Sequence, residues 1–251
     1  MNVAGLAGFI LCFVAIIFGI ATNGGIVTIF NFIHFPSLIV TLGGSFFAVL
    51  ATADSMSDFL DGLTSIFHAY QTQVTSPEDI SNEILGMADI ARKEGLLNLE
   101  DYASKLEHAF LAKGVKLIVD GTDPELVRDI LESELVHKYE KGKKRVYFWK
   151  DLGSYAPAWG MIGTLLGLIN MMKSMGSDSS AIGAGMSLAL ITTLYGSVIA
   201  NWICIPVAKK IEKNEQADQL IMELIIEGVL SIQAGENPRI IKEKIMAILE
   251  N

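Results

Sequence analysis

The sequence contains long stretches with no charged side chain. Residues 1–53, 152–172 and 179–208 include no Asp, Glu, Lys or Arg. The chain is 51% hydrophobic with a mean hydropathy of +0.43, which is too apolar for an ordinary soluble domain. Since about 20 apolar residues in a helix cross the core of a bilayer, we predict an all-α, polytopic membrane protein. Its four transmembrane helices are expected at about residues 3–21, 30–53, 152–173 and 181–208.

The sequence also lacks the patterns that several kinds of site require. Its two cysteines, Cys12 and Cys204, lie in separate predicted spans, so their spacing indicates neither a disulfide nor a metal site. No phosphate loop, dinucleotide fingerprint or metal-spaced set of His and Cys occurs. The net charge of −9 argues against nucleic acid as a partner, because a phosphate backbone attracts a basic surface. We expect no enzymatic activity and no bound cofactor.

No predicted span contains a carboxylate. A transporter that carries its own ion is expected to place an ionisable side chain within the membrane. Hydroxyl and amide groups can line an ion path, but they cannot take up and release a proton near neutral pH. Any ion that this chain helps to move should therefore be bound by a carboxylate of another chain.

The basic residues lie on one side of the predicted spans. Almost all of them fall between residues 54 and 151 or after residue 208, and basic residues favour the cytoplasmic side. The prediction is a protein of the bacterial inner membrane with both termini in the cytoplasm. Its parts are transmembrane helices 1 and 2 (1–53), a helical cytoplasmic domain (54–151), transmembrane helices 3 and 4 (152–208) and a helical cytoplasmic tail (209–251).

Capping signals divide the cytoplasmic domain into helices. Residues 54–70 are expected to continue the second span, and residues 76–79 (Ser-Pro-Glu-Asp) predict the start of a new helix. Residues 122–125 (Thr-Asp-Pro-Glu) predict another helix start through a capping box. The basic and aromatic residues of 139–150 are expected to anchor the chain at the membrane surface, in contact with lipid.

Prolines and small residues mark the third and fourth spans. Pro157 lies at the inner start of the third and Pro206 at the inner end of the fourth, and each frees a backbone carbonyl that neighbouring helices or water must satisfy. Small and hydroxyl residues recur along one face of each helix. Such a face either packs closely against another helix or turns its hydroxyls toward a shared cavity, and the sequence leaves both interpretations open. The face residues are Gly160, Thr164, Gly167 and Met171 in the third span, and Gly185, Ala189, Thr192, Thr193, Gly196, Ser197, Ala200 and Asn201 in the fourth.

Four segments match the pattern of a known family. They are residues 36–44 (Pro-Ser-Leu-Ile-Val-Thr-Leu-Gly-Gly), 92–100 (Arg-Lys-Glu-Gly-Leu-Leu-Asn-Leu-Glu), 155–167 (Tyr-Ala-Pro-Ala-Trp-Gly-Met-Ile-Gly-Thr-Leu-Leu-Gly) and 192–196 (Thr-Thr-Leu-Tyr-Gly). In this order and spacing, over nearly the whole chain, they resemble the flagellar motor stator proteins of the MotA/PomA family.

The resemblance implies a homopentamer of this chain around two copies of a single-span partner of the MotB/PomB type. The partner's Asp takes the ion and its outer domain holds peptidoglycan. Proton or sodium flow then drives torque on the rotor protein FliG, and with it flagellar rotation and motility. By this resemblance Pro157 and Pro206 couple ion passage to movement, and Thr164 and Thr193 lie beside the partner's Asp.

The resemblance also implies two kinds of protein contact. Arg92 and Glu100 would contact FliG, whereas the sequence alone favours a solvated helix end for both. The residues expected to pack against the partner's helix are Gly160, Gly167, Gly196 and Tyr195.

The coupling ion and two rival functions stay open. Sodium-driven stators have Thr at the position of Thr164, whereas proton-driven stators have either Ala or Thr. A first rival is an energiser of another envelope process that resembles ExbB and TolQ. That group typically has three spans, and the 92–100 segment counts against it. A second rival is a membrane scaffold that moves no ion.

Overall fold

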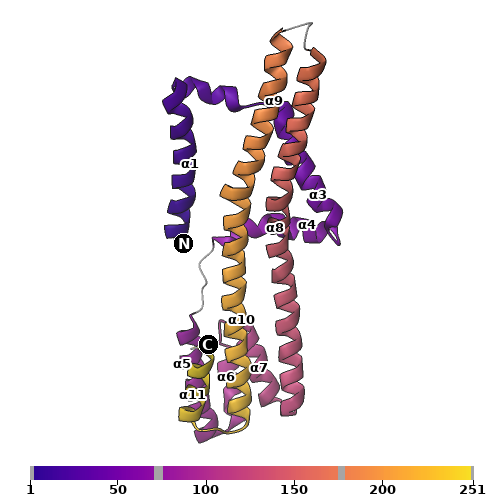
Figure 1. Cartoon of the computed structure of the whole chain (residues 1–251). Coiled ribbons are helices and arrows are strands. Elements are labelled where there is room, and N and C mark those ends of the chain that lie inside the picture. Colours follow the sequence, from indigo (N-terminus) through magenta and orange to yellow (C-terminus); the bar gives the residue numbers. More distant parts are fainter. Residues whose placement is uncertain (1–2, 71–75, 175–178, 250–251) are drawn as a thin grey trace. The chain divides into compact units, whose positions relative to one another are not determined.

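The computed structural model describes residues 3–70, 76–174 and 179–249, and every element within these ranges is a helix (Figure 1). The predicted all-α fold is therefore confirmed. In chain order the elements are α1 (Val3–Gly24), η1 (Ile26–Phe32), α2 (Phe35–Leu38), η2 (Ile39–Gly43), α3 (Gly44–Thr52), α4 (Met56–Ala69), α5 (Pro77–Glu94), η3 (Leu96–Leu99), α6 (Glu100–Ala103), α7 (Ala109–Val119), α8 (Pro124–Ser174), α9 (Ser179–Val198), η4 (Ile199–Cys204), α10 (Ile205–Gln233) and α11 (Pro238–Leu249).

Three helical stretches of the described residues are long and apolar enough to cross a membrane. They are Phe35–Thr52, Pro124–Lys173 and Ile182–Gln233, and α1 contains a shorter apolar stretch, Ala7–Thr22. Large apolar side chains such as Phe47, which is 71% exposed, lie on the outside of these helices, where a soluble protein would bury them. The chain is thus a membrane protein, and the count of four spans stays a prediction.

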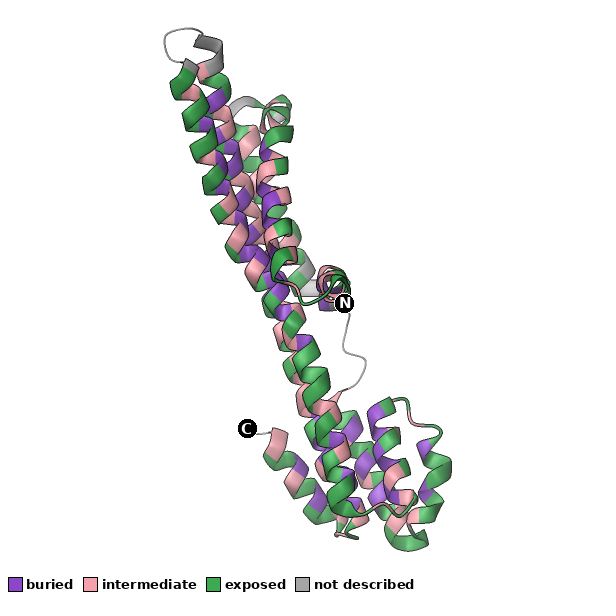
Figure 2. Ribbon diagram, turned by 90° about the vertical axis from the view of Figure 1, so that its right-hand side faces the viewer, coloured by how far each residue is buried: buried purple, intermediate pink, exposed green. Residues whose placement is uncertain are grey.

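The chain forms two compact units. The first contains residues Met1–Thr72 and Lys143–Glu212, and the second contains Gln73–Gly142 and Lys213–Asn251. These units differ from the segments predicted from charge, because α4 folds with the first unit and the tail folds with the helices of the second. The tail provides much of the second unit's core, and Figure 2 shows buried residues along the inner sides of these helices. The most enclosed side chains there include Ile84, Leu111, Leu131, Leu224, Ile225 and Ile245.

The helix of the second span does not continue into residues 54–70. Helix α3 stops at Thr52, Ala53 is extended, and α4 begins at Met56. The Ser55 hydroxyl accepts the backbone N–H of Asp58 at 3.1 Å, which is the bond of an N-cap. The prediction that residues 54–70 continue the second span is therefore wrong, and the Ser-x-x-Asp spacing was the signal that could have shown the break.

Helix α8 runs without interruption from the second unit into the first. It begins at Pro124, as the predicted capping box requires, although the Asp123 carboxylate, rather than Thr122, accepts the N–H of Glu125 at 2.9 Å. The helix continues to Ser174 with Pro157 inside it. Helix α8 therefore contains residues of both units.

Two π-helical turns have no counterpart in the predictions. They are η2, in the second span, and η4, which ends at Cys204 and is followed directly by α10. Pro206 lies just after η4, and in a regular α-helix its ring would clash with the carbonyl of Trp202. A widened turn at this point relieves that clash.

Candidate functional site

Small residues bring the backbones of α8 and α9 into contact. A Cβ atom added at Gly167 would lie 2.5 Å from the carbonyl oxygen of Gly185, and one added at Gly196 would lie 2.5 Å from that of Ala156. Gly160 is similarly close to the carbonyl of Thr192, at 2.8 Å. The packing interpretation of the small faces therefore holds between helices of this chain. Packing of the same glycines against a partner's helix stays a prediction.

Thr164 and Thr193 form a hydroxyl pair across this contact. Their Oγ1 atoms are 2.5 Å apart, and Thr164 Oγ1 is also 3.1 Å from the carbonyl oxygens of Gly160 and Ala189. Thr193 Oγ1 is 3.3 Å from the same Ala189 carbonyl. Thr193 is exposed and Thr164 is half-buried, so the pair lies at the edge of the helix contact. The structure thus brings together two of the predicted ion-path residues.

The polar groups of α9 and η4 continue from this pair along one exposed stripe. Thr193, Ser197 and Asn201 are all exposed and follow one another at spacings of four residues, which is one face of a helix. Large apolar side chains of α8 and α9 are also exposed, among them Leu165 of α8 (57%) and Leu190 of α9 (63%). Exposed hydroxyl and amide groups of this kind can hydrogen-bond with another helix in a membrane.

The two predicted coupling prolines lie near the same contact between helices, far along the chain from residues 175–178. One turn before Pro157, a Cβ at Gly153 would lie 3.1 Å from Cys204 Cβ, and Pro206 follows Cys204 by two residues. Pro157 itself adjoins α9, because a Cβ at Gly196 would lie 3.0 Å from its Cα. Both prolines are half-buried. Pro157 and Pro206 therefore lie near the point where α8 contacts the boundary between η4 and α10.

Tyr195 holds the N-terminal start of the predicted second span against α9. Its hydroxyl donates to the carbonyl of Phe32 and accepts the backbone N–H of His34, the latter at 3.0 Å. Deeper in the same span, Thr41 Oγ1 lies 3.4 Å from the carbonyl oxygen of Thr192. The hydroxyl of Tyr195 is thus engaged within the chain, and a contact with a partner's helix stays a prediction.

The predicted rotor-contact residues lie on either side of a turn in the second unit. Arg92 is in the last turn of α5, and Glu100 begins α6. Gly95, with φ of +91°, and η3 reverse the chain between them, and Leu99 anchors the turn because it is fully buried. Arg92 and Glu100 are exposed, and no ion pair joins either of them to another described residue. Both are available to a second protein.

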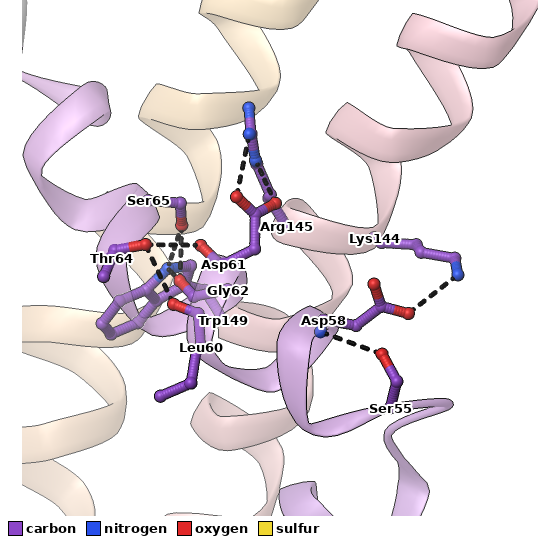
Figure 3. Close-up of polar contacts among 10 residues, drawn as sticks. All are labelled: Ser55, Asp58, Leu60, Asp61, Gly62, Thr64, Ser65, Lys144, Arg145 and Trp149. Atoms are coloured by element: carbon purple, nitrogen blue, oxygen red, sulfur yellow. Dashed lines mark hydrogen bonds and ion pairs between the residues drawn. The ribbon is translucent and has the colours of Figure 1, made fainter.

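Two basic residues of the segment predicted as a surface anchor form ion pairs with acidic residues of 54–61. Lys144 Nζ lies 2.8 Å from a carboxylate oxygen of Asp54 and 3.1 Å from one of Asp58. Arg145 makes two bonds to Asp61, of 2.7 and 3.0 Å, and Figure 3 shows the contacts with Asp58 and Asp61. The pKa of Lys144 is raised, chiefly by its hydrogen bonds to the two carboxylates. These acids precede the basic segment by more than eighty residues, so local pattern analysis missed the pairing.

The aromatic residues of this segment are also inside the protein. Trp149 is only 3% exposed and Phe148 only 7%. The indole N–H of Trp149 lies 3.1 Å from the carbonyl of Gly62 and 2.9 Å from Ser65 Oγ (Figure 3). The predicted interfacial anchor is therefore wrong for these two residues, because large aromatic side chains also fill buried contacts and the Trp149 N–H has partners there.

The sequence and the fold both resemble known proteins. Residues 102–224 match the MotA/TolQ/ExbB proton channel family. Motility protein A of Treponema phagedenis is 35% identical over 249 residues, which is 99% of this chain and 94% of the relative. Chemotaxis protein PomA of Vibrio alginolyticus is 37% identical over 241 residues, or 96% of this chain and 92% of the relative.

Solved structures match at full length. The flagellar MotAB stator complex from Bacillus subtilis superimposes with a TM-score of 0.85 and 27% identity, over 98% of this chain and 95% of the solved one. The C. jejuni MotAB structure gives a TM-score of 0.89 over 99% and 96% of the two chains; at 24% identity it supports the fold alone.

Proposed function

Since the chain belongs to the MotA/TolQ/ExbB proton channel family, as a relative of its motility protein A members, we propose how it works as a flagellar motor stator subunit. It forms an ion channel with a MotB-type partner and couples ion flow to torque on the rotor. The observation that carries the mechanism is the Thr164–Thr193 hydroxyl pair, which lies at the edge of an exposed apolar face and has no carboxylate in the spans around it.

The hydrogen bonds of the pair determine what it can bind. Each threonine hydroxyl has one proton and two lone pairs. Neighbouring carbonyls, or the other hydroxyl, accept the protons of Thr164 and Thr193. Lone pairs are then the groups left for a ligand, and they suit a cation or a protonated carboxylic acid. This supports a partner Asp that carries the ion past the pair, with H+ or Na+ as the transported species and no bound cofactor.

Pro157 and Pro206 are the proposed coupling residues. Both interrupt the backbone hydrogen bonding of their helices where α8 meets the start of α10. Moving one elementary charge through 100 mV releases about 2.3 kcal/mol, which is enough to shift a conformational equilibrium of a few kcal/mol. One ion per small helix movement is thus energetically sufficient.

The proposed assembly has five copies of this chain around two copies of the partner. It lies in the bacterial inner membrane with both termini in the cytoplasm, and the rotor protein FliG meets Arg92 and Glu100. Their exposure, without ion pairs among the described residues, supports this contact. Surface charges of this kind set the rate and register of a transient association more than its affinity. The chain acts as a channel subunit and not as an enzyme.

The channel proposal is tested by removing one hydroxyl without changing the shape of the side chain. Thr193→Val in the co-purified complex with its partner should lower ion flux about tenfold or more, since one lost ligand costs at least about 1.4 kcal/mol. Thr193→Ser should retain flux. The control is Thr22→Val, which removes an exposed hydroxyl from α1 that bonds only its own helix. Normal flux and swimming in Thr193→Val would contradict the proposed role of the pair.

The rotor contact is tested by charge reversal. Arg92→Glu should impair swimming, leave ion flux unchanged and be partly rescued by an opposite charge change on the rotor. Arg128→Glu is the control, because Arg128 is an exposed arginine of the same unit whose partner is Glu132. Unimpaired swimming with both Arg92 and Glu100 reversed would show that they are solvated surface.

A further inference from the structure

Three aromatic side chains join helix α1 to η4. The ring of Phe9 stacks on that of Trp202, with centroids 4.7 Å apart and planes at 25°. Phe13, one turn later on the same face of α1, also stacks on Trp202, at 5.5 Å and 18°. No described residue of α1 belongs to either hydrophobic core of the chain. We call Phe9, Phe13 and Trp202 the aromatic cluster, and it is a main contact of α1 with the rest of its unit.

A hydrogen bond sets the position of Trp202 within this cluster. The indole N–H of Trp202 donates to the backbone carbonyl of Phe9, at 2.9 Å. This carbonyl lies inside α1, where it also accepts a backbone N–H of its own helix, so the indole uses its second lone pair. Stacked rings can slide over one another, because stacking favours a range of offsets. The hydrogen bond removes that freedom and fixes Trp202 against one point of α1.

Trp202 lies in the turn that the proposed coupling residue Pro206 disturbs. Helix η4 ends at Cys204, and Pro206 is the second residue of α10. Trp202 precedes Pro206 by four residues, so its carbonyl is the one that loses the usual helical N–H partner. π-Helical turns such as η4 occur frequently at functional sites. The residue held by α1 is therefore the residue whose backbone is freed by the proline.

The side chains of η4 face three different surroundings. Asn201 is exposed and belongs to the polar stripe that begins at Thr193. Cys204 is fully buried, and its Cβ would lie 3.1 Å from a Cβ atom at Gly153 of α8. Trp202 makes the contact with α1. A displacement of η4 from the side of the polar stripe would therefore act on its contact with α1 as well as on its contact with α8.

We propose that α1 is part of the coupling machinery and that Trp202 is the positioning residue that connects α1 to it. By holding η4 against α1, Trp202 restricts the directions in which the turn before Pro206 can move. Ion passage then produces one defined movement instead of several loose ones. The proposal rests on the stator function proposed above and gives α1 a role in it. Trp202 acts through the backbone of η4 and not by contact with the ion.

The test removes the indole N–H while keeping an aromatic ring. Trp202→Phe does this at η4, and Trp149→Phe is the matched control, since it removes an indole N–H that bonds Gly62 and Ser65 in the same unit. Two quantities are measured: the torque added when one stator unit joins a working motor, and the ion flux of the reconstituted complex. Torque per unit does not depend on how much of a variant folds or assembles. Lower stability alone would therefore leave it unchanged.

Trp202→Phe should lower the torque per unit about two- to threefold with flux retained, because one hydrogen bond between membrane helices shifts an equilibrium by about that factor. Trp149→Phe should unfold at a lower temperature but keep the parent torque per unit. Phe13→Leu, which removes a stacked ring at an exposed position, should also lower the torque per unit, and it decides the question if Trp202→Phe does not fold.

Three results would overturn the proposal. The first is parent torque per unit in both Trp202→Phe and Phe13→Leu. The second is an equal loss of torque in Trp149→Phe, since the effect would then not be specific to η4. The third is a loss of flux in proportion to the torque, because Trp202 would then serve the ion path and not the coupling. A parent complex that conducts no ions and adds no torque would instead contradict the stator function itself.

Discussion

Gly167 offers a direct test of the helix contact that positions the hydroxyl pair. In an isolated helix, Gly→Ala stabilises by about 0.5–1 kcal/mol because glycine loses more backbone entropy on folding. In this contact the new Cβ would lie 2.5 Å from the carbonyl oxygen of Gly185 and 2.7 Å from the nitrogen of Ala189. Both neighbours are backbone atoms, so no side chain can rotate away.

The expected cost follows from these distances. Restoring an ordinary carbon–oxygen separation of about 3.3 Å requires the helices to move apart by about 0.8 Å. Overpacking of this kind typically costs about 1–3 kcal/mol, which exceeds the gain in helix propensity. The same movement would lengthen the bond from Thr164 to the carbonyl of Ala189, now 3.1 Å, to about 3.9 Å, beyond hydrogen-bonding distance. Gly167→Ala should therefore lose both stability and ion coupling.

The assay is thermal unfolding of the detergent-solubilised complex, followed by tryptophan fluorescence, together with swimming speed. Gly167→Ala should unfold about 5 °C below the parent protein. The control is Gly183→Ala on α9, where a new Cβ meets nothing within 4 Å. The control should unfold at the parent temperature or slightly above it. If Gly167→Ala unfolds as late as the control and supports normal swimming, α8 and α9 do not meet through this glycine.

Three further tests address other contacts. Tyr195→Phe leaves a carbonyl and an N–H of the second span unpaired, and should lower the free energy of unfolding by about 1–3 kcal/mol, measured by thermal unfolding. Asp61→Arg should destabilise the first unit, and adding Arg145→Asp should restore about half of the loss in the same assay, whereas no restoration would show that the pair is not in contact. The pKa of His108 lies below its usual value of 6.5, mainly because of burial and secondarily because of Lys138, while Asp218 opposes the shift. Since the unfolded chain then binds the proton first as pH falls, stability should decrease below about pH 6.5, and His108→Asn, which can still cap α7, should flatten that dependence.

Local signals in the sequence predicted the helices well, because each signal and its effect lie within a few residues. Ser76 caps α5 through its hydroxyl, and Gly235 and Pro238 separate α10 from α11, as the sequence indicates. The spacing of glycines in α8 predicted a close contact. Spacing could not show which helix packs there, because a partner's helix and a helix of the same chain both require small residues at the contact.

Contacts between distant segments set the limit of prediction. Both Phe148 and Trp149 contact α4 at Gly62. A Cβ atom at this position would lie 2.5 Å from the ring of Phe148, so only glycine allows the ring to come this close. The carbonyl of the same glycine accepts the indole N–H of Trp149. The pairing of Arg145 with Asp61 likewise joins residues 84 positions apart. Nothing near residue 145 distinguishes an arginine that binds a lipid headgroup from one that binds an aspartate.

The absence of a carboxylate from the predicted spans and the presence of the hydroxyl pair have one explanation: contact with the carboxylate must change when it binds or releases an ion. A carboxylate placed permanently beside Thr164 and Thr193 would face lone pairs, because both hydroxyl protons are directed to carbonyls or to each other. Such a site disfavours the bare anion and favours the acid or the ion-bound form. A carboxylate on a separate chain can approach the pair when it is neutralised and leave when it is charged. An ion-dependent change of contact is what a motor needs to convert ion release into movement, and a carboxylate fixed within these spans would remove it.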